Sequence, residues 1–521
     1  MNTNTLIWVL IAFGVYLMLM VVIGAICIKD NNSSEDYFLG GRRLNGFVTA
    51  MSAQASDMSG WLLMGLPGSI YAMGAGQAWI GIGLLIGTVL NWIFVASRLR
   101  EYTIVAGNSL TLPEFFSDRF KDDKNILLSV SSIVIVIFFL IYTASALSSG
   151  GKLFNSIFGI DYHVAIIMGV FVVLLYTFMG GFLAVCKTDM IQGILMLIAL
   201  LSVPVLAYSI MGPDRFSATL IDSGVNPTSF LNIFQENGNK ISTVSLISSL
   251  AWGLGYFGMP HILVRFMAVK NERELKKSKV VGIVWVVLSL VFACFIGILG
   301  RAYLYPVILG VEGGESTENV FIEMIKQLFI NDIHAPFIAG IFLCAILAAI
   351  MSTADSQLLV ASSSVAEDFF NKFLCESIFK KKASDSTIIS ISRITVCIVA
   401  ILAFIIAWNP DNSVMALVSD AWAGFGAAFG PLVLCALFWK RTNLYGALSG
   451  IISGAVVVLI WDYIPFLSGN TISEVTGLYS LVPGFFISLL FIVVVSMTTP
   501  APSNEIIEEF DKVDAICKKK N

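Results

Sequence analysis

An acidic side chain stands in the middle of an apolar segment. Asp57 lies within residues 47–74, which are otherwise apolar over a length that can cross a bilayer. A carboxylate at the bilayer centre costs at least ~2.5 to 3.5 kcal/mol, so we expect it to face a protein interior or a water-filled path. Gly60, Pro67 and Gly68 are points where this helix can open and free its backbone carbonyls. Such oxygens at mid-depth predict a hard-cation site in a membrane transporter.

Hydroxyl groups follow a helical stripe in a second apolar segment, residues 335–364. At 3.6 residues per turn, Ala349, Ser352 and Ser356 fall on one face, with Thr353 beside them. Small alanines let a neighbouring helix approach, and the hydroxyls can offer oxygen to a cation. The alternative is that each hydroxyl bonds to the carbonyl one turn earlier. These residues alone leave both interpretations open.

Two further carboxylates have a structural and a functional interpretation. Asp189 opens a predicted span, residues 189–211, where an acid is favoured by the helix dipole and can cap the helix. Asp355 lies three residues after Ser352, on the same stripe. The functional alternative is a cation exit relay, in which both acids pass Na⁺ inward or one of them stays protonated.

Aromatic residues near the predicted breaks are candidates to bind an organic solute. Trp252 and Tyr256 stand four residues apart in a glycine-interrupted segment, residues 249–261, and Tyr142 lies in another apolar segment. A compact, partly apolar solute needs apolar faces with polar groups at its ends. Most aromatic residues in membrane proteins serve packing or interfacial belts, so packing is the alternative for each.

Composition places the chain among polytopic membrane proteins. It has 521 residues, of which 57% are hydrophobic and 13% charged, and its mean hydropathy is +0.86. Soluble domains are about 45–50% apolar and about 25% charged. The eight cysteines and three histidines show no paired spacing, so we expect no disulfide framework, metal centre or enzyme active site.

Hydropathy predicts about thirteen spans. Their approximate ranges are 6–28, 47–73, 76–97, 126–154, 164–185, 189–211, 242–260, 280–304, 335–364, 388–408, 414–439, 444–462 and 478–498. All but five of the 31 basic residues fall on one side of these spans. By the positive-inside rule, the C-terminus is cytoplasmic and the N-terminus is outside.

Two of the thirteen spans are interrupted by glycine, and they lie five spans apart. Broken helices at corresponding positions of two halves indicate an inverted repeat with the binding site at its interface. Close helix packing is the structural alternative for such glycines. We therefore expect a transmembrane domain over residues 1–499, with core repeats at about 47–211 and 242–439. Residues 500–521 form a cytoplasmic tail, which we expect to be solvated rather than a surface helix.

Six motifs resemble the sodium:solute symporter family, and together they cover essentially the whole chain. The longest are AQASDMSGWLLMGLPG at residues 53–68, YTFMGGFLA at 176–184 and WGLGYFGMPHILVRF at 252–266. The shorter ones are FLGGR at residues 38–42, LTLP at 110–113 and WAGFGAAFGP at 422–431. The resemblance implies an all-α polytopic fold with about thirteen transmembrane helices and a LeuT-like 5+5 inverted repeat.

The resemblance also implies roles for individual residues. For sodium it implies the carbonyls of Ala55, Met58 and Ala349, the hydroxyls of Ser352 and Thr353, and the nearby acid Asp57. For the solute it implies Ser59, Gly60, Tyr142, Trp252, Tyr256 and Pro260. For ion coupling and release it implies Arg42 and Asp189. Asp355 and Ser356 depart from the small residues expected there, which leaves a second cation site and the sodium:solute ratio open.

The expected activity is sodium-coupled uptake of L-proline by alternating access across the bacterial cell membrane. The coupling ion is Na⁺ or Li⁺, with no cofactor, no nucleic acid and no obligate protein partner. The alternative is a symporter of the same fold for another small carboxylate, amino acid or sugar. A sensor kinase would need a cytoplasmic kinase domain, and only about twenty residues follow the last span.

Overall fold

The computed structural model is almost entirely helical. It describes residues 2–27, 33–177, 181–311, 315–467 and 469–520. Within these ranges, the strands form two short antiparallel hairpins. They pair β1 (Gln235–Glu236) with β2 (Asn239–Lys240), and β3 (Pro465–Leu467) with β4 (Asn470–Thr471). The all-α prediction is therefore confirmed for the body of the molecule.

Ten helices of the described ranges are long and apolar enough to cross a membrane. Two of them, residues 75–106 and 336–378, include stretches of 3-10 or π helix. Their regular parts are α1 (Thr3–Cys27), α5 (Ala78–Leu90) with α6 (Ala96–Ala106), α8 (Ile126–Phe158), α10 (Phe182–Met211), α15 (Glu272–Tyr303), α17 (Pro336–Ser363), α18 (Asp385–Ile406), α19 (Val414–Phe438), α20 (Leu444–Tyr463) and α22 (Leu481–Thr498).

The remaining helices are shorter. Those outside the two broken segments are α2 (Ser34–Leu39), α7 (Leu112–Phe120), α9 (Tyr162–Thr177), α11 (Pro213–Asp222), α12 (Pro227–Phe230), α16 (Val320–Ile325), α21 (Ile472–Thr476) and α23 (Asn504–Lys520). Irregular turns of 3-10 or π type are η2 (Gly40–Arg42), η4 (Ala75–Gln77), η5 (Asn91–Val95), η7 (Thr317–Asn319), η8 (Lys326–Asp332) and η9 (Ser364–Ile378).

Three of the thirteen predicted spans are absent from the ten long helices, and each has a local reason. Predicted spans 47–73 and 242–260 are divided by breaks. Predicted span 164–185 corresponds to α9, which has 16 residues. The motif at residues 176–184 begins in the last two residues of α9 and ends in α10, and its residues 178–180 lie outside the described ranges.

The first broken segment comprises α3 (Gly46–Asp57), the π-helical turn η3 (Trp61–Gly65) and α4 (Leu66–Met73). The second comprises α13 (Thr243–Ala251), the 3-10 segment η6 (Trp252–Gly258) and α14 (Pro260–Met267). Both breaks were predicted from glycine. Pro67 and Gly68, however, do not open their helix, because residues 60–73 stay helical and Pro67 follows directly on the π-helical turn η3.

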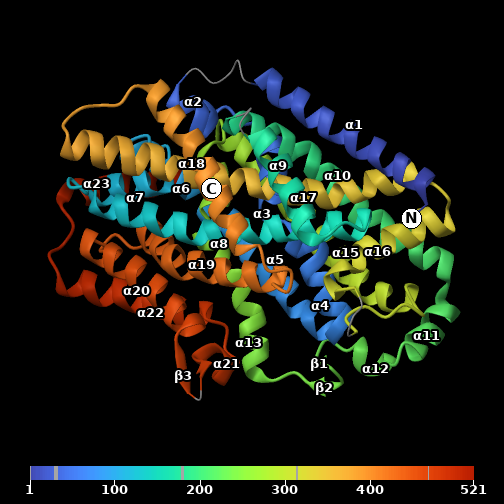
Figure 1. The fold of residues 1–521 in the computed structure, drawn as a ribbon. Helices are drawn as coiled ribbons and strands as arrows, with labels where there is room; N and C mark the ends of the chain where they lie inside the picture. Colours follow the sequence, from blue (N-terminus) through green and yellow to red (C-terminus); the bar gives the residue numbers. More distant parts are fainter. Residues whose placement is uncertain (1, 28–32, 178–180, 312–314, 468, 521) are drawn as a thin grey trace.

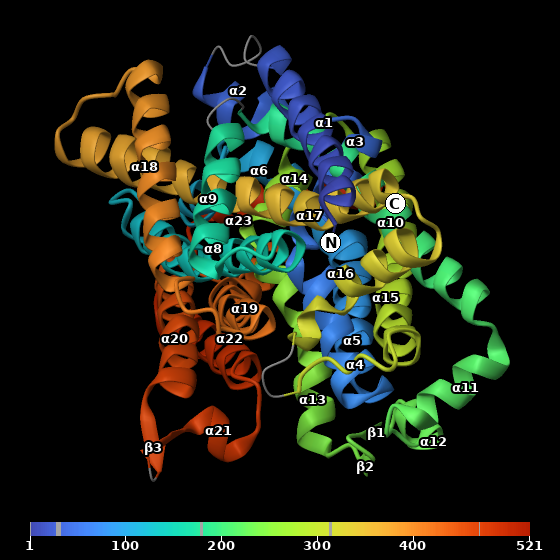
Figure 2. The same ribbon diagram turned by 45° about the vertical axis from the view of Figure 1, so that its right-hand side comes forward.

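The broken helices lie at the centre of the molecule. α3 packs against α10, α14, α15 and α17, while η6 packs against α5 and α19. Figures 1 and 2 show α1 along one edge beside α10 and α17. Both views also place α2 at the opposite end of the molecule from hairpin β1–β2, as the predicted alternation of loops requires.

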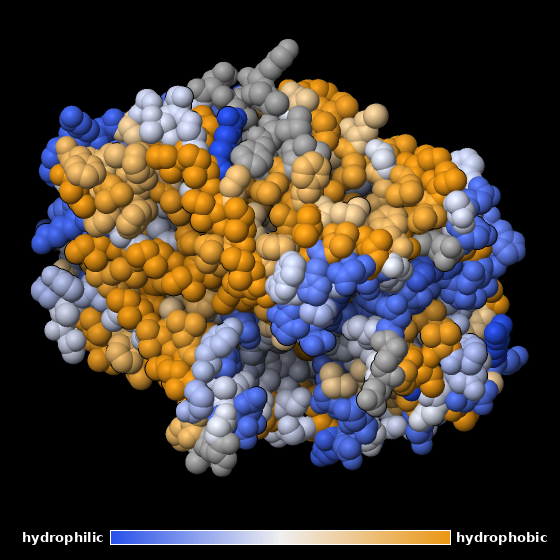
Figure 3. All heavy atoms as spheres, in the orientation of Figure 1, coloured by the Kyte–Doolittle hydropathy of each residue, from blue (hydrophilic) through white to orange (hydrophobic). Residues whose placement is uncertain are grey.

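The outer surface carries the apolar residues that a bilayer would cover. Figure 3 shows hydrophobic residues over a broad part of one face, with hydrophilic residues at its borders and in a patch to the right. Met18 of α1 is 70% exposed and Phe171 of α9 is 65% exposed. Contact with lipid acyl chains explains why such side chains are stable on the outside.

The C-terminal segment differs from the solvated tail that the sequence predicted. Residues Asn504–Lys520 form α23, which packs against α6. Its Phe510 and Val513 are buried, and its Asp514 forms a 2.8 Å ion pair with Arg98 of α6. The helix is stable because its apolar stripe meets an inner surface of the protein rather than water.

Candidate functional site

The first break frees backbone groups next to Asp57. The regular helix α3 ends at Asp57, and Met58 leaves the helical conformation with φ −88° and ψ 79°. Helical structure resumes at Gly60, where a Cβ atom would lie 2.3 Å from the Ser149 hydroxyl of α8. Glycine is therefore required for this close approach, and the chain opens over about two residues in a buried region.

The break and the hydroxyl stripe of α17 meet directly. The Ser352 hydroxyl donates to the Ala55 carbonyl at 2.7 Å and is 3.2 Å from the Ala349 carbonyl. All three residues are fully buried. The Ser352 hydroxyl thus lies within hydrogen-bonding distance of two carbonyl oxygens that the sequence predicted for the same sodium site, one from each of two distant segments. Carbonyl and hydroxyl oxygens are suitable ligands for an alkali ion.

Two other predicted sodium ligands lie beside this cluster in sequence. The Thr353 hydroxyl is buried and has no hydrogen-bond partner in the described part of the chain, so its lone pairs are available to a ligand. Met58 is buried, and its sulfur accepts from the Ser289 hydroxyl of α15 at 3.3 Å. We name the oxygens of Ala55, Met58, Ala349, Ser352 and Thr353 the oxygen cage.

The Asp57 carboxylate is bonded to the second broken helix. The Tyr256 hydroxyl of η6 donates to Asp57 Oδ2 at 2.6 Å, and Asp57 Oδ1 has no hydrogen-bond partner among the described residues. The Asp57 carbonyl accepts from Trp61 Nε1 at 2.9 Å and from the Tyr142 hydroxyl at 3.4 Å. Asp57 therefore lies between the oxygen cage and the aromatic residues.

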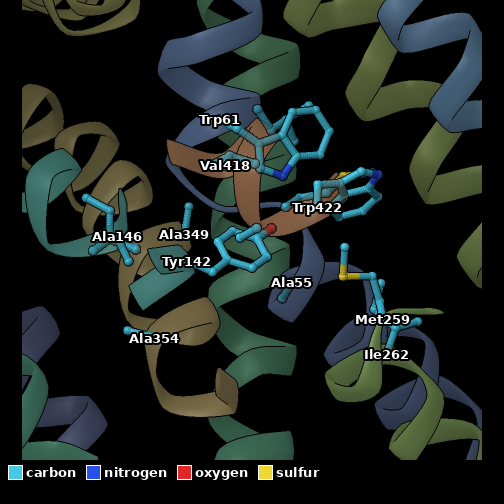
Figure 4. Close-up of a cluster of buried hydrophobic side chains, with 14 of the residues drawn as sticks. Ala55, Trp61, Tyr142, Ala146, Met259, Ile262, Ala349, Ala354, Val418 and Trp422 are labelled. Carbon is cyan, nitrogen blue, oxygen red and sulfur yellow. The ribbon is translucent and has the colours of Figure 1, made fainter. Parts of the chain in front are cut away.

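The aromatic residues predicted for the solute come together around this point. Figure 4 shows Tyr142 between Ala349 of α17 and Trp422 of α19, with Trp61 nearby. Tyr256 meets Trp422 edge to face at 5.1 Å between ring centroids. Their apolar rings and hydroxyl groups give the mixed surface that a small zwitterion with an apolar ring needs.

Trp252 joins the same group through Tyr479 and Trp422. Its ring stacks on Tyr479 at 5.3 Å, and its carbonyl accepts from Trp422 Nε1 at 2.8 Å. A Cβ atom on Gly255 would lie 2.0 Å from Trp422 Nε1, so only glycine fits between them. The 3-10 winding of η6 and its glycines thus position Trp252 and Tyr256 against α19.

The other predicted solute residues surround the two breaks. Ser59 is buried, and its hydroxyl accepts from the Trp61 amide at 3.4 Å. Pro260 begins α14 and lines a very small cavity with Leu110, Thr111 and Val264. Pro260 therefore lies four residues after Tyr256, where regular helix resumes after η6.

Asp189 does not cap a helix, because α10 begins at Phe182 and runs through the predicted loop. The Asp189 carboxylate is fully buried. Its Oδ2 accepts from the Ser52 hydroxyl at 2.6 Å and lies 3.3 Å from Arg265 Nη2. Arg265 also donates to the Ser356 hydroxyl, so Asp189 and Ser356 share a guanidinium.

Asp355 and Arg42 complete the predicted ion-coupling residues. Asp355 is fully buried on α17, beside Ser356. Arg42 lies apart, where it donates to the carbonyls of Met267 and Ser109 and to the Asn108 side chain. Burial and the nearby Arg100 lower the pKa of Arg42 to about 10, which still leaves it charged near neutral pH.

Three residues of the site were not assigned from the sequence. Trp422, Arg265 and Ser52 lie within or beside recognised motifs, but no role followed from their positions in the chain. The strongest available signal was Arg265, because a cation in an apolar helix demands a partner. Trp422 gave no such signal, since a tryptophan in a membrane helix is most often packing.

Comparison with known proteins agrees with this geometry. Residues 37–454 match the model of the sodium:solute symporter family. The chain is 44% identical over 514 residues to the sodium/proline symporters of Staphylococcus aureus strains JH9 and NCTC 8325 / PS 47. Each alignment covers 98% of this chain and 96% of the relative.

Two solved structures share the fold. A Na⁺-coupled sialic acid symporter in a substrate-bound outward-open state aligns with a TM-score of 0.74 and 20% identity, over 95% of this chain and 99% of that one. The nucleobase-cation-symport-1 family transporter Mhp1, in a closed conformation with bromovinylhydantoin bound, aligns with a TM-score of 0.53 and 13% identity, over 92% and 99% of the two chains.

Proposed function

The chain belongs to the sodium:solute symporter family, and on this basis we propose that it couples sodium entry to the uptake of L-proline by alternating access. The assignment of proline as the solute rests on the 44% identity to sodium/proline symporters over nearly the whole chain. The contact between Ser352 and Ala55 supports the ion, because it brings the hydroxyl stripe to the opened helix.

Sodium binds first in the oxygen cage. It replaces the hydrogen bond between Ser352 and the Ala55 carbonyl, and so joins the opened end of α3 to α17. Li⁺, which prefers the same hard oxygen ligands, substitutes for Na⁺ at this position. Asp57 contributes its negative charge from the adjacent position.

Proline binds between the two broken helices. Its ring packs on Tyr142, Trp252 and Tyr256, and its carboxylate meets the backbone amide of Gly60 at the break. Pro260 shapes the inner side of the pocket. Since Asp57 touches both regions, sodium organises the pocket that proline enters.

The repeat architecture follows from the position of the two breaks. We assign thirteen transmembrane helices by counting each broken segment as one span and adding α9 to the ten long helices. The two 5+5 repeats are then about residues 47–211 and 242–439, and the bundle that holds both breaks rocks against the remaining helices. The N-terminus faces outside, and residues 500–521 face the cytoplasm.

The sodium gradient supplies enough free energy for this function. One charge crossing 100 mV is worth ~2.3 kcal/mol, and a tenfold concentration gradient adds ~1.4 kcal/mol. Together they support roughly a few-hundred-fold accumulation of solute for each sodium ion.

The proposal is tested with purified protein in proteoliposomes. We expect an inward sodium gradient to drive accumulation of labelled proline, and excess unlabelled proline to compete more strongly than other amino acids or sugars. Equal accumulation with choline on both sides would overturn sodium coupling. Stronger competition by another solute would overturn the assignment of proline.

A further inference from the structure

Two cavities follow one another along the C-terminal ends of α10 and α15. The first has a volume of about 530 Å³ and is lined by Ser209 of α10 and Leu299 of α15, among others. The second has a volume of about 320 Å³, and Ile210 of α10 and Ala302 of α15 line it. The cavities are therefore adjacent. Both are near α11, which lies at the right-hand edge of the molecule in Figures 1 and 2.

The first cavity is an apolar groove between two helices that are long and apolar enough to cross a membrane. Its lining includes the aromatic rings of Tyr208, Phe292 and Phe295. Phe295 is 44% exposed and Tyr208 is 41% exposed, so the groove opens to the outer surface. Water is a poor occupant of such a groove, whereas a lipid acyl chain gains free energy there in proportion to the apolar area that it buries.

The second cavity is polar and carries one charge of each sign. Arg215, in the first turn of α11, and Asp332, the last residue of η8, both line it. The Arg215 guanidinium has no ion pair or hydrogen bond within the described residues. Asp332 accepts from Gln327 Nε2 at 2.9 Å and from the Tyr303 hydroxyl, so its position is fixed. Asp214, beside Arg215, is exposed and does not line the cavity.

We propose that the two cavities together bind one zwitterionic phospholipid, with an acyl chain in the apolar groove and the headgroup in the polar cavity. Consecutive residues of α11 serve both parts, because Arg215 lines the polar cavity and Phe216 lines the groove. This site goes beyond the proposed function, since it involves neither the coupling ion nor the solute.

The charges in the polar cavity select the headgroup. The planar guanidinium of Arg215 suits a phosphate, and the dipole at the start of α11 also favours an anion there. Asp332 and the last carbonyls of α15 favour a primary ammonium group, such as that of phosphatidylethanolamine. An anionic headgroup without an ammonium group would leave Asp332 facing a like charge.

The test is native mass spectrometry of the full chain in detergent, titrated with phosphatidylethanolamine, phosphatidylglycerol or phosphatidylcholine, all with dioleoyl chains. We expect one phosphatidylethanolamine to bind at least about fivefold more tightly than either of the others. Phosphatidylglycerol has no ammonium group, and the trimethylated nitrogen of phosphatidylcholine cannot donate a hydrogen bond to Asp332.

Three variants of exposed residues test the headgroup contacts. R215A should weaken phosphatidylethanolamine binding by at least about tenfold, because the phosphate loses a charged donor. D332N should remove the preference over phosphatidylglycerol, because no negative charge is left to repel it. K240A is the control, since Lys240 is an exposed cation that lines neither cavity, and its affinity should equal that of the parent.

S209W tests the acyl chain, because an indole at this position fills part of the groove, and it should weaken the binding of all three lipids. I198W is its control, since Ile198 is an exposed residue of the same helix outside the groove. If S209W does not accumulate in membranes, R215A and D332N decide.

Equal affinity for the three lipids, unchanged in R215A, would indicate only the annular lipid shell and overturn the site. Tighter binding of phosphatidylglycerol would overturn the zwitterionic headgroup. Unchanged affinities in folded S209W would overturn the place given to the acyl chain.

Discussion

Tyr256 Oη lies 2.6 Å from Asp57 Oδ2, and this hydrogen bond joins the two broken helices. Both side chains are buried, so no water competes for the contact. Asp57 follows Ala55 of the oxygen cage by two residues, and Tyr256 contacts Trp422 in the aromatic pocket. A change in the oxygen cage therefore affects the aromatic pocket, and a change in the pocket affects the cage. Reciprocal tightening of ion and solute is what symport requires.

D57N should raise the sodium concentration for half-maximal proline uptake by more than about tenfold, because a negative charge within a few ångströms of the ion is worth more than ~1.4 kcal/mol in a partly buried site. Asparagine keeps the size of the side chain and an acceptor for Tyr256, so the protein should still fold. The measurement is uptake against sodium concentration in proteoliposomes, with thermal unfolding of the same preparation.

Y256F provides the matched control for D57N. It removes the hydrogen bond but keeps the Asp57 charge, so we expect weaker proline binding with a smaller change in sodium dependence. Sodium dependence in D57N equal to that of the parent protein would contradict the role given to Asp57.

S352A should weaken sodium binding several-fold, since it removes one neutral oxygen from the cage, which is worth about 0.5–1.5 kcal/mol. T353A should have a similar effect, although the Thr353 hydroxyl makes no hydrogen bond within the described residues. S363A, on the same helix, removes a hydroxyl that donates to the Val360 carbonyl and serves as the control. Equal sodium dependence in all three variants would exclude Ser352 and Thr353 as ligands.

The parts of this structure that the sequence predicted are those with a strong local signal. Apolar runs marked the spans, glycines marked the breaks in α3–α4 and α13–α14, and Asp57 marked the site. The start of α10 was misplaced because Lys187 and Asp189 read as a loop, whereas Asp189 is compensated by Arg265 from a distant segment. That pairing, like the docking of α23 on Arg98, is a tertiary contact with no local pattern.

G87A should disable transport with little loss of protein in the membrane. A Cβ atom on Gly87 of α5 would lie 2.1 Å from the Gly253 carbonyl of η6, so the helices would have to separate at the point that positions Trp252. G81A on the same helix is the control, since its Cβ would meet its neighbours at an ordinary 3.8 Å. Proline binding and uptake are compared for both. Full activity of G87A would show that this contact is not needed.

Removal of residues 504–520 should lower thermal stability and leave sodium-dependent uptake measurable. The lost contacts include the Arg98–Asp514 pair, the Lys121–Glu509 pair and the cation–π contact of Arg98 with Phe510 at 4.9 Å. D514N should cause part of this loss of thermal stability. D511N should give almost none, because the Lys440–Asp511 pair is exposed and 3.6 Å long.

The docking of α23 should also be independent of pH near neutrality. Hydrogen bonds from Arg98 and Lys518 lower the pKa of Asp514 below its ordinary value of 3.8. The contribution of this carboxylate is therefore present above 3.8 and is lost only as the pH falls through the lower folded value. Hydrogen exchange of residues 504–520 should be similar, after correction for the intrinsic rate, between about pH 5 and 8. Loss of protection within that range would contradict the assignment.

K152M should loosen the segment that holds Glu318 at the edge of a cavity of about 830 Å³. Lys152 of α8 lies 2.6 Å from Glu318, which also accepts from the Ser413 hydroxyl and the Met415 amide at the start of α19. The Glu318 side chain is 9% exposed, and the backbone there lies against Gly68 of α4. Loss of Lys152 leaves this carboxylate with two hydrogen bonds but without its cation, and outward movement of the segment brings it into water.

This movement is measured by the rate at which a maleimide modifies A72C, which lines the cavity, in purified protein without other reactive cysteines. We expect at least tenfold faster modification in K152M, and a rate close to the parent in K152M/E318Q, where no charge is left unpaired. K326M is the control. The partner of Lys326, Glu323, lies on the same helical turn, and its side chain is more exposed (18%) than that of Glu318. Because the segment containing Glu318 would have to close again in each cycle, K152M should also lower the maximal uptake rate more than it changes proline affinity. An unchanged labelling rate in K152M would show that other contacts hold the segment in place.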